Sequence, residues 1–459
     1  MKERTYRLLH FSFYDQTAIT RHLEQMAQKG WLLEKTGSAL WRYRAIAPQD
    51  LRFAVTYFPE ASEFDPGPTE GQQVLADFAA RDGWQYLTQW GQMQIFFTER
   101  EDAPPMETEP AIQVETIFRA MKKNLIPSHL VMLLLCLYQL GFDLVRFRQD
   151  TVDFLSTPYL LLSLPLWAML LLEECWEIFC CLRWYRRAKP MAEDGVFLPV
   201  RTRQTLSILL LVSALLVIFS ISLLSSNGRW AMVMWLGLMV LAIVASGWVK
   251  DKLKAIGASR AFTRTATILT ATMVTVVFVF GLTFGIIRGG FLGRKDAVGS
   301  YDMGGWTFEI YDDPMPLYVE DLTDTGDSLW SREQVRSNST FLLCRREYRQ
   351  DLVEGPKELR DLAYTIVDTR FPALEDTVRR SLLAERQDEI HGDYVFIDHY
   401  EPVDPVPWGA EEAWQLHWSD GVLNTWLVFW EGRAVEVKFY WPPTAEQITI
   451  AAEKLRPTE

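Results

Sequence analysis

Two glutamates at the end of a hydrophobic stretch are well placed for chemistry. Glu173 and Glu177 lie one helical turn apart, with Glu174 beside them. Two carboxylates on one helical face are able to bind a cation or to exchange protons. The same pattern also marks the point where a helix leaves a membrane and its carboxylates meet basic residues. We favour this second interpretation, with Arg183, Arg186 or Arg187 as the partners.

Two tryptophans occupy matching positions in a repeated pattern. Trp31 lies in "AQKGWLLEKTGSALWRYR", residues 27–44, and Trp84 lies in "ARDGWQYLTQWGQMQIFF", residues 80–97. Both stretches indicate a helix end, Gly-Trp, a strand, a Gly-containing turn and a second strand. We interpret both Trp as core residues at the point where helix meets strand. The alternative is a paired aromatic binding pocket.

Motifs of known enzyme classes are absent from the sequence. It contains no Walker A loop, no G-x-G-x-x-G, no H-E-x-x-H and no G-x-S-x-G. The nearest approach to a metal cluster is His391, Asp398, His399 and Glu401, but alternation along a strand points Asp398 and His399 to opposite faces. The five cysteines lack the paired spacing of a zinc site. The sequence therefore predicts a non-catalytic protein without a metal or cofactor.

The middle of the chain contains long apolar stretches, and one of them must position Glu173 and Glu177. A bilayer core about 30 Å thick requires roughly 20 apolar helical residues. Five stretches meet this requirement, which predicts a membrane protein with an α-helical core of about five spans: Asn124 to Phe142, Phe154 to Leu172, Gln204 to Gly228, Trp230 to Val249 and Ala266 to Ile287.

Charge predicts the orientation of these spans. The flanks on one side contain fourteen Lys and Arg and those on the other contain six, which places the N-terminus in the cytoplasm and the C-terminus outside the cell membrane. Residues 295–459 contain 33 acidic and 16 basic residues, a net charge of −17 in a chain whose total is −13. This acidic segment argues against nucleic acid as a partner and permits cations or basic peptides.

Both ends of the chain predict α+β domains. Residues 1–100 predict a cytoplasmic domain with an internal α-β-β repeat, in the manner of a ferredoxin-like sandwich. A linker and juxtamembrane helix, 101–123, and the spans, 124–288, follow. Residues 295–459 predict an extracytoplasmic acidic domain. Its expected strands are 306–311, 341–348, 364–369, 394–399, 413–418, 423–430 and 434–440, and its expected helices are 372–387 and 444–455.

Three N-terminal runs, "FSFYDQTAITRHLEQMAQKGWLLEKTG", "LRFAVTYFPEASEFDP" and "ARDGWQYLTQWGQMQIFFTERED", carry a family resemblance. Over roughly the first 100 residues the chain resembles DUF2812, a bacterial family described only as a domain of unknown function. Gly30-Trp31, Tyr57-Phe58-Pro59 and Gly83-Trp84 carry the match. The resemblance implies multi-pass membrane proteins of the Firmicutes type, often encoded beside PadR-like transcriptional regulators, and it supplies no catalytic residues.

These observations predict a membrane sensor or regulatory interaction protein that links an outer domain to an inner one. Its expected partners are the lipid bilayer and a protein on the cytoplasmic side, and envelope response with a PadR-like regulator is a possible role. The alternative is a transporter accessory or peptide-resistance protein, suggested by the acidic exterior. The oligomeric state does not follow from the sequence.

Overall fold

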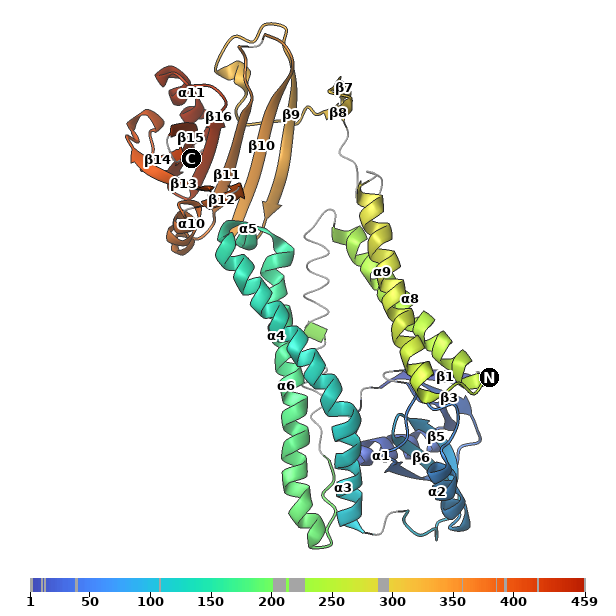
Figure 1. The fold of residues 1–459 in the computed structure, drawn as a ribbon. Coiled ribbons are helices and arrows are strands. Elements are labelled where there is room, and N and C mark those ends of the chain that lie inside the picture. Colours follow the sequence, from blue (N-terminus) through green and yellow to red (C-terminus); the bar gives the residue numbers. More distant parts are fainter. Residues whose placement is uncertain are drawn as a thin grey trace. The chain divides into compact units, whose positions relative to one another are not determined.

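The structure is a computed structural model that describes residues 3–9, 11, 14–37, 40–106, 109–200, 212–213, 228–287, 297–356, 358–384, 386–391, 394–418 and 421–457. The chain forms two compact units, shown as ribbons in Figure 1. The first comprises Met1–Leu140 and Pro165–Leu292, and the second comprises Gly141–Leu164 and Gly293–Glu459. We call residues 3–106 the N-terminal domain and residues 297–457 the C-terminal domain.

The N-terminal domain is built from one β-α-β-β pattern used twice. The first copy contains β1 (Arg4–Leu8), α1 (Gln16–Gln28), β2 (Trp31–Lys35) and β3 (Leu40–Ala45), and the second contains β4 (Arg52–Tyr57), α2 (Glu70–Arg81), β5 (Gln85–Trp90) and β6 (Met93–Thr98). Each copy forms its own three-stranded antiparallel sheet, in the order β1-β3-β2 or β4-β6-β5. The predicted α-β-β repeat is therefore present with one more strand. The single sheet of a ferredoxin-like sandwich does not occur among the described residues.

Helix caps explain why both copies fold alike. The Asp15 side chain accepts a hydrogen bond from the amide of Ala18 at the start of α1, and Thr69 forms a capping box with Gln72 at the start of α2. Gly30 and Gly83 follow the helix C-caps with φ of 82° and 88°. Glycine adopts this left-handed conformation without steric cost. The repeated Gly-Trp motif is thus a helix stop followed directly by the chain's entry into a strand.

Long helices make up most of what the structure describes in the remainder of the first unit. The helix α3 (Pro110–Ala120) continues through a π-helical turn, η1 (Met121–Leu125), into α4 (Ile126–Gln149), and α6 spans Pro158–Glu193. The helices α8 (Gly228–Ala255) and α9 (Arg260–Ile287) pack along each other. The domain division passes through α4 after Leu140 and through α6 before Pro165.

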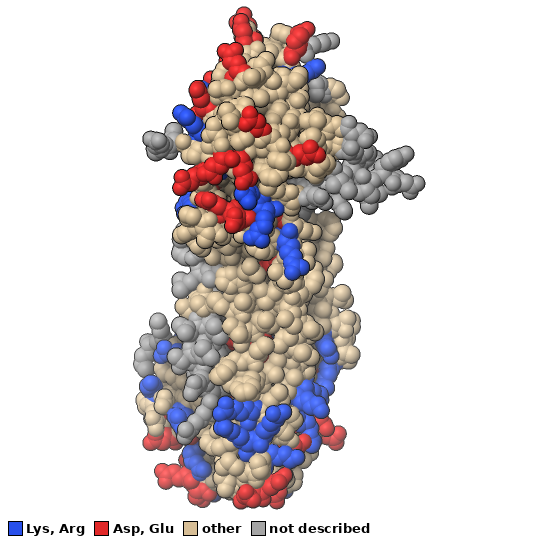
Figure 2. Space-filling model, turned by 90° about the vertical axis from the view of Figure 1, so that its left-hand side faces the viewer, with Lys and Arg blue, Asp and Glu red and all other residues tan. Residues whose placement is uncertain are grey.

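Three of the described helical segments are long and apolar enough to cross a membrane: Pro110–Gln149, Pro158–Glu193 and Arg260–Phe278. They overlap the first, second and fifth predicted spans, with different bounds. The fourth, 230–249, lies within α8, and the third, 204–228, lies almost wholly outside the described residues. Five spans therefore remain a prediction. On the face drawn in Figure 2, Lys and Arg side chains gather on the first unit, and Asp and Glu dominate the charges of the C-terminal domain.

An eight-stranded antiparallel sheet dominates the C-terminal domain, in the order β12-β13-β14-β15-β16-β11-β10-β9. Its strands are β9 (Leu329–Ser339), β10 (Leu343–Glu354), β11 (Leu362–Thr369), β12 (Arg386–His391), β13 (Tyr394–Val403), β14 (Glu412–Trp418), β15 (Gly421–Trp430) and β16 (Arg433–Phe439). A separate hairpin contains β7 (Gly299–Met303) and β8 (Trp306–Ile310).

Both faces of this sheet are covered. Val428 lies in one hydrophobic cluster, while its neighbours Leu427 and Phe429 lie in another, as strand alternation requires. The helix α11 (Ala445–Leu455) packs on the Val428 face. The helix α10 (Glu375–Leu382) and the short helix α5 (Thr151–Ser156) pack on the opposite face.

Two predictions for the helices of this domain have different outcomes. The predicted helix 444–455 is confirmed as α11, and Thr444 and Gln447 form a capping box at its start. The predicted helix 372–387 is too long: α10 ends at Leu382, and Arg386 already pairs with Asp398 as part of β12. Sheet pairing outweighs local helix preference at this point.

Candidate functional site

A histidine and a glutamate form a buried pair between two long helices of the first unit. The Nδ1 atom of His129 on α4 lies 2.5 Å from Oε2 of Glu174 on α6. The Glu174 residue is 7% exposed. The sequence singled out its neighbours, Glu173 and Glu177, which are both half-buried. A shared proton between imidazole and carboxylate is the chemistry that this pair supports.

A proline accounts for the local helix geometry beside His129. Pro127 lacks an N–H and therefore cannot donate to the carbonyl four residues before it. The turn immediately preceding it, η1, is π-helical, and the Ile126 amide donates to the carbonyl of Met121. Single π-helical turns within α-helices often lie at functional sites. This turn sets the rotation of α4, and hence the direction in which His129 points.

The N-terminal domain packs directly on these helices. One hydrophobic cluster includes Ile19 and Leu23 of α1, Val114 and Ile117 of α3, and four residues of α6, namely Cys181, Trp184, Ala188 and Ala192. The ring of Tyr14 lies 6.0 Å from that of Trp184. Burial, reinforced by the negative charge of Glu177, raises the pKa of the Tyr14 hydroxyl. A displacement of α6 would therefore move residues that form part of the hydrophobic core of the N-terminal domain.

The N-terminal domain also forms ion pairs with residues on either side of the turn between α8 and α9. Arg260 donates two hydrogen bonds to the buried carboxylate of Asp65, at 2.6 and 2.8 Å. Lys250 lies 3.1 Å from Glu63, and Lys254 donates to the Glu63 carbonyl at 2.9 Å. The loop 60–65 thus contacts the helices that precede and follow this turn. We call these contacts the loop 60–65 clamp.

The two tryptophans from the repeat lie in different hydrophobic clusters. Trp31 packs against the cluster that contains α1 and α6. Trp84 is 3% exposed, belongs to a smaller cluster with Ala79 and Phe96, and donates its indole N–H to the carbonyl of Pro104. The arrangement matches the core interpretation more closely than a shared aromatic pocket.

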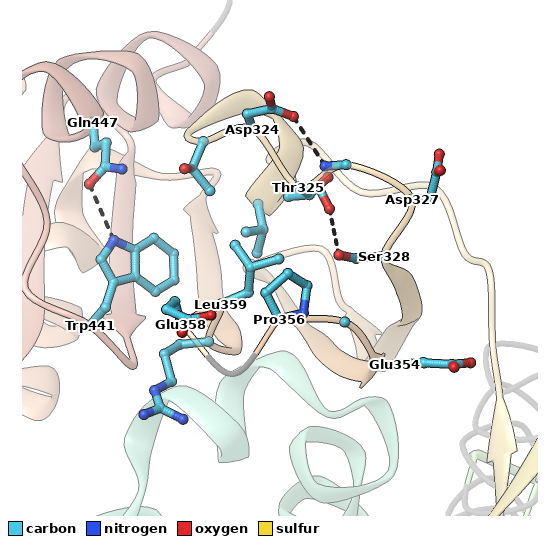
Figure 3. Close-up of a pocket in the computed structure, with 15 residues that line it drawn as sticks. Asp324, Thr325, Asp327, Ser328, Glu354, Pro356, Glu358, Leu359, Trp441 and Gln447 are labelled. Carbon is cyan, nitrogen blue, oxygen red and sulfur yellow. Dashed lines mark hydrogen bonds between the residues drawn. The ribbon is translucent and has the colours of Figure 1, made fainter.

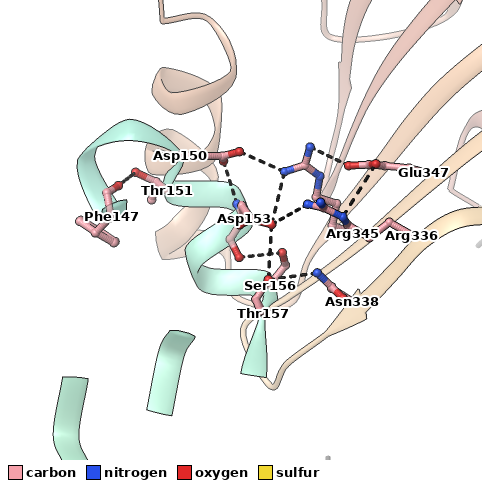
Figure 4. Close-up of polar contacts among 10 residues, drawn as sticks. All are labelled: Phe147, Asp150, Thr151, Asp153, Ser156, Thr157, Arg336, Asn338, Arg345 and Glu347. Atoms are coloured by element: carbon pink, nitrogen blue, oxygen red, sulfur yellow. Dashed lines mark hydrogen bonds and ion pairs between the residues drawn. The ribbon is translucent and has the colours of Figure 1, made fainter. Parts of the chain in front are cut away.

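Charged contacts join α5 to the sheet of the C-terminal domain (Figure 4). Asp150, the N-cap of α5, accepts a hydrogen bond from Arg345 of β10 at 3.2 Å. Asp153 accepts one from Arg336 of β9 at 2.8 Å. Glu347 completes the network, 2.7 Å from the second guanidinium nitrogen of Arg345. Arg345 and Glu347 are 18% and 22% exposed, so their ion pair is partly shielded from solvent and salt, whereas Asp150 is 52% exposed.

Neutral and apolar contacts reinforce this junction. The Asn338 amide donates to the Thr157 hydroxyl at 3.0 Å, and the Thr340 hydroxyl donates to the carbonyl of Leu155 at 2.7 Å. Beneath them, Phe154 is 1% exposed. It shares a hydrophobic cluster with residues of five C-terminal elements, including Leu343, Val367, Val378, Leu427 and Ala434. We call this combined interface the α5 junction.

A groove of about 700 Å³ lies at the other end of β9 and β10 (Figure 3). The loop 323–328 that precedes β9 and the loop 354–360 that follows β10 form its walls. Leu359, Pro356 and Trp441 supply apolar surface, and the Trp441 indole N–H donates to Gln447 at 3.2 Å. Four exposed carboxylates line the groove, those of Asp324, Asp327, Glu354 and Glu358.

One histidine of the predicted metal-like cluster, His399, shares a carboxylate with His417, which was not among the residues predicted for that cluster. His399 lies opposite His417 in the β13–β14 pairing, with Nε2 atoms 3.3 and 3.7 Å from the two oxygens of Glu401. The side chains of His391 and Asp398 lie outside the described part of the structure. Within the described part, no group of three or more His, Cys, Asp or Glu has the arrangement of a metal site.

The α5 junction is the feature that sequence reasoning missed. Phe154 and Leu155 were assigned to the start of the second span, because an apolar run looks the same whether lipid or protein covers it. Asp150-Thr151-Val152-Asp153 offered one signal, since Asp at an N-cap starts a helix. The basic partners, Arg336 and Arg345, lie nearly two hundred residues later, and no local sequence pattern connects them with α5.

Comparison with known proteins identifies one family. Residues 16–128 match the model of a family described as "Protein of unknown function (DUF2812)", which confirms the resemblance noted in the sequence. The match extends beyond the N-terminal domain through α3 and into α4, so it includes part of the helical surface on which that domain packs. Neither the curated proteins nor the solved structures yielded a match.

Proposed function

We propose that this DUF2812-containing chain is a multi-pass membrane sensor or regulatory interaction protein. In this proposal, the C-terminal domain receives a signal outside the cell membrane and the N-terminal domain passes it to a cytoplasmic protein. The chain acts without catalysis, and a PadR-like regulator of an envelope response is the partner class that the sequence resemblance suggests. Apolar helices of spanning length and the excess of Lys and Arg on one flank support the membrane location.

The observation that carries the proposal is that the two domains contact consecutive helices: the C-terminal domain contacts α5 and the N-terminal domain contacts α6. The helix α5 is held by the sheet of the C-terminal domain through the α5 junction. Along α6, four residues from Cys181 to Ala192 belong to the core cluster of the N-terminal domain. The helix α6 begins two residues after α5 ends and continues to Glu193, so a single helix leads from the end of α5 to the contact with the N-terminal domain. Such an element is able to carry a displacement from one domain to the other.

Signal transfer requires two states that the ligand distinguishes. A ligand shifts the equilibrium only by its difference in affinity for the two states. The α5 junction is suited to such a change, since its ion pairs and its apolar contacts can rearrange together. The loop 60–65 clamp is the corresponding contact on the N-terminal domain, because it joins that domain to α8 and α9.

The two-sided arrangement is tested by reporter fusions. An alkaline phosphatase fused after Glu459 is expected to be active and a β-galactosidase at that position inactive, with the reverse result for fusions at the N-terminus. These enzymes report opposite sides of the membrane. A C-terminus in the cytoplasm would contradict the proposal.

A transporter accessory or peptide-resistance role is the second candidate. The acidic C-terminal domain favours it, because net negative charge outside the membrane attracts cationic peptides. Affinity purification of the full chain from membranes separates the two roles. Co-purification of a permease supports the accessory role, and capture of a transcriptional regulator by the N-terminal domain supports the sensor.

A further inference from the structure

We propose that the groove between the loops 323–328 and 354–360 binds a basic, amphipathic peptide segment. This inference rests on the proposed sensor function and names the class of its ligand. The groove has a volume of about 700 Å³, within the range of about 300–1,000 Å³ that ligand sites occupy. An extended segment of a few residues is the occupant that this open shape accommodates.

The apolar part of the groove favours a ligand that carries apolar side chains. Leu359 and Trp441 are half-buried, so each presents part of its surface to the groove. The hydrogen bond from the Trp441 indole to Gln447 fixes the ring, and the ring of Phe439 supports it edge-on at 5.2 Å. A rigid aromatic surface binds aliphatic groups and cations at low entropic cost.

The charged residues of the groove favour a basic ligand. Asp324 and Asp327 come from the loop before β9, whereas Glu354 is the last residue of β10 and Glu358 lies in the loop that follows it. Arg360 is the basic residue among the described lining residues, so negative charge predominates. These carboxylates are exposed and lie on two separate segments of the chain. This spacing suits several Lys or Arg side chains along a peptide, whereas a metal ion requires ligands that converge on one point.

The strands β9 and β10 connect the groove to the α5 junction. Leu329 pairs with Glu354 at the groove end of the two strands, and Ser339 pairs with Cys344 at the junction end. Arg345 and Glu354 lie nine residues apart on β10, about 30 Å along an extended strand. A ligand that draws the two loops together would therefore act on the same pair of strands that holds α5.

Binding is tested with the full chain in nanodiscs of zwitterionic lipid and a fluorescein-labelled peptide of alternating Lys and Leu residues. Asp324→Asn, Asp327→Asn, Glu354→Gln and Glu358→Gln together remove the charge of the groove. The matched control removes four exposed charges elsewhere in the domain, with Asp404→Asn, Glu411→Gln, Glu431→Gln and Glu453→Gln. Fluorescence anisotropy is expected to show a Kd about tenfold weaker for the groove variant and within about twofold for the control.

Three results would overturn the inference. The first is that the unmodified chain binds the peptide no better than empty nanodiscs do. The second is an equal loss in the two variants, which would mean that net charge alone attracts the peptide. The third is equally tight binding of a Gln-Leu peptide, which would remove the need for a cation. None of these results changes the contacts of the α5 junction, so the coupling of the domains is tested separately.

Discussion

At the scale of single residues, the His129–Glu174 pair shows what sequence reasoning reaches and where it stops. Spacing on a helix drew attention to residues 173–177, but it favoured Glu173 and Glu177 over Glu174, which is the glutamate that contacts His129. Which of three adjacent glutamates faces a histidine depends on the rotation and packing of two helices. That rotation follows from the π-helical turn before Pro127, which no periodicity in the sequence reveals.

Substitution of His129 by Ala is expected to destabilise the first unit by about 3 kcal/mol, because Glu174 would remain buried without its partner. Adding Glu174→Gln should recover part of this loss, since the uncompensated carboxylate disappears. His399→Ala serves as the control, because its side chain is 42% exposed and its partner Glu401 is 54% exposed, so neither group is left buried without a partner. Thermal unfolding of the four proteins in nanodiscs provides the measurement. Equal stability of the single and double variants would show that the pair is not coupled.

At the scale of elements, local signals predicted helix ends well and edge strands poorly. The Gly-Trp pattern predicted helix ends at Gly30 and Gly83, and both glycines directly follow the C-cap of a helix. The strands β9 and β12 were missed, because polar sequences such as "LWSREQVRSNS" lack a continuous apolar face. Both strands lie at the edges of the sheet, where each is held mainly by backbone hydrogen bonds to one neighbouring strand and needs fewer buried apolar side chains.

Replacement of Gly30 by Ala tests the role of the repeated Gly-Trp motif. Gly30 has a φ of 82°, and an added Cβ would lie 3.0 Å from the carbonyl oxygen of Ile46. The expected cost is about 1–2 kcal/mol. It should appear as faster hydrogen exchange in α1 and β3. Gly67→Ala is the matched control, since a Cβ there meets no atom within 4 Å. Similar exchange in both variants would contradict the assigned role.

At the scale of the whole molecule, the sequence predicted the segregation into soluble and apolar segments. It placed a domain boundary near residue 295, where charge and hydropathy change abruptly. It did not predict that residues 141–164 join the C-terminal unit. That grouping depends on contacts between α5 and strands nearly two hundred residues away, which short-range patterns do not encode.

The central claim, that the C-terminal domain acts on the N-terminal domain through α5 and α6, is tested most directly by hydrogen–deuterium exchange of the Phe154→Ala variant in nanodiscs. Phe154 is buried in the α5 junction, and its truncation should cost about 3–5 kcal/mol there. Phe371→Ala is the control, because Phe371 is 48% exposed. The account predicts that only Phe154→Ala raises exchange both in α5 and in residues 181–192 of α6, together with α1. Faster exchange confined to the C-terminal unit would contradict it.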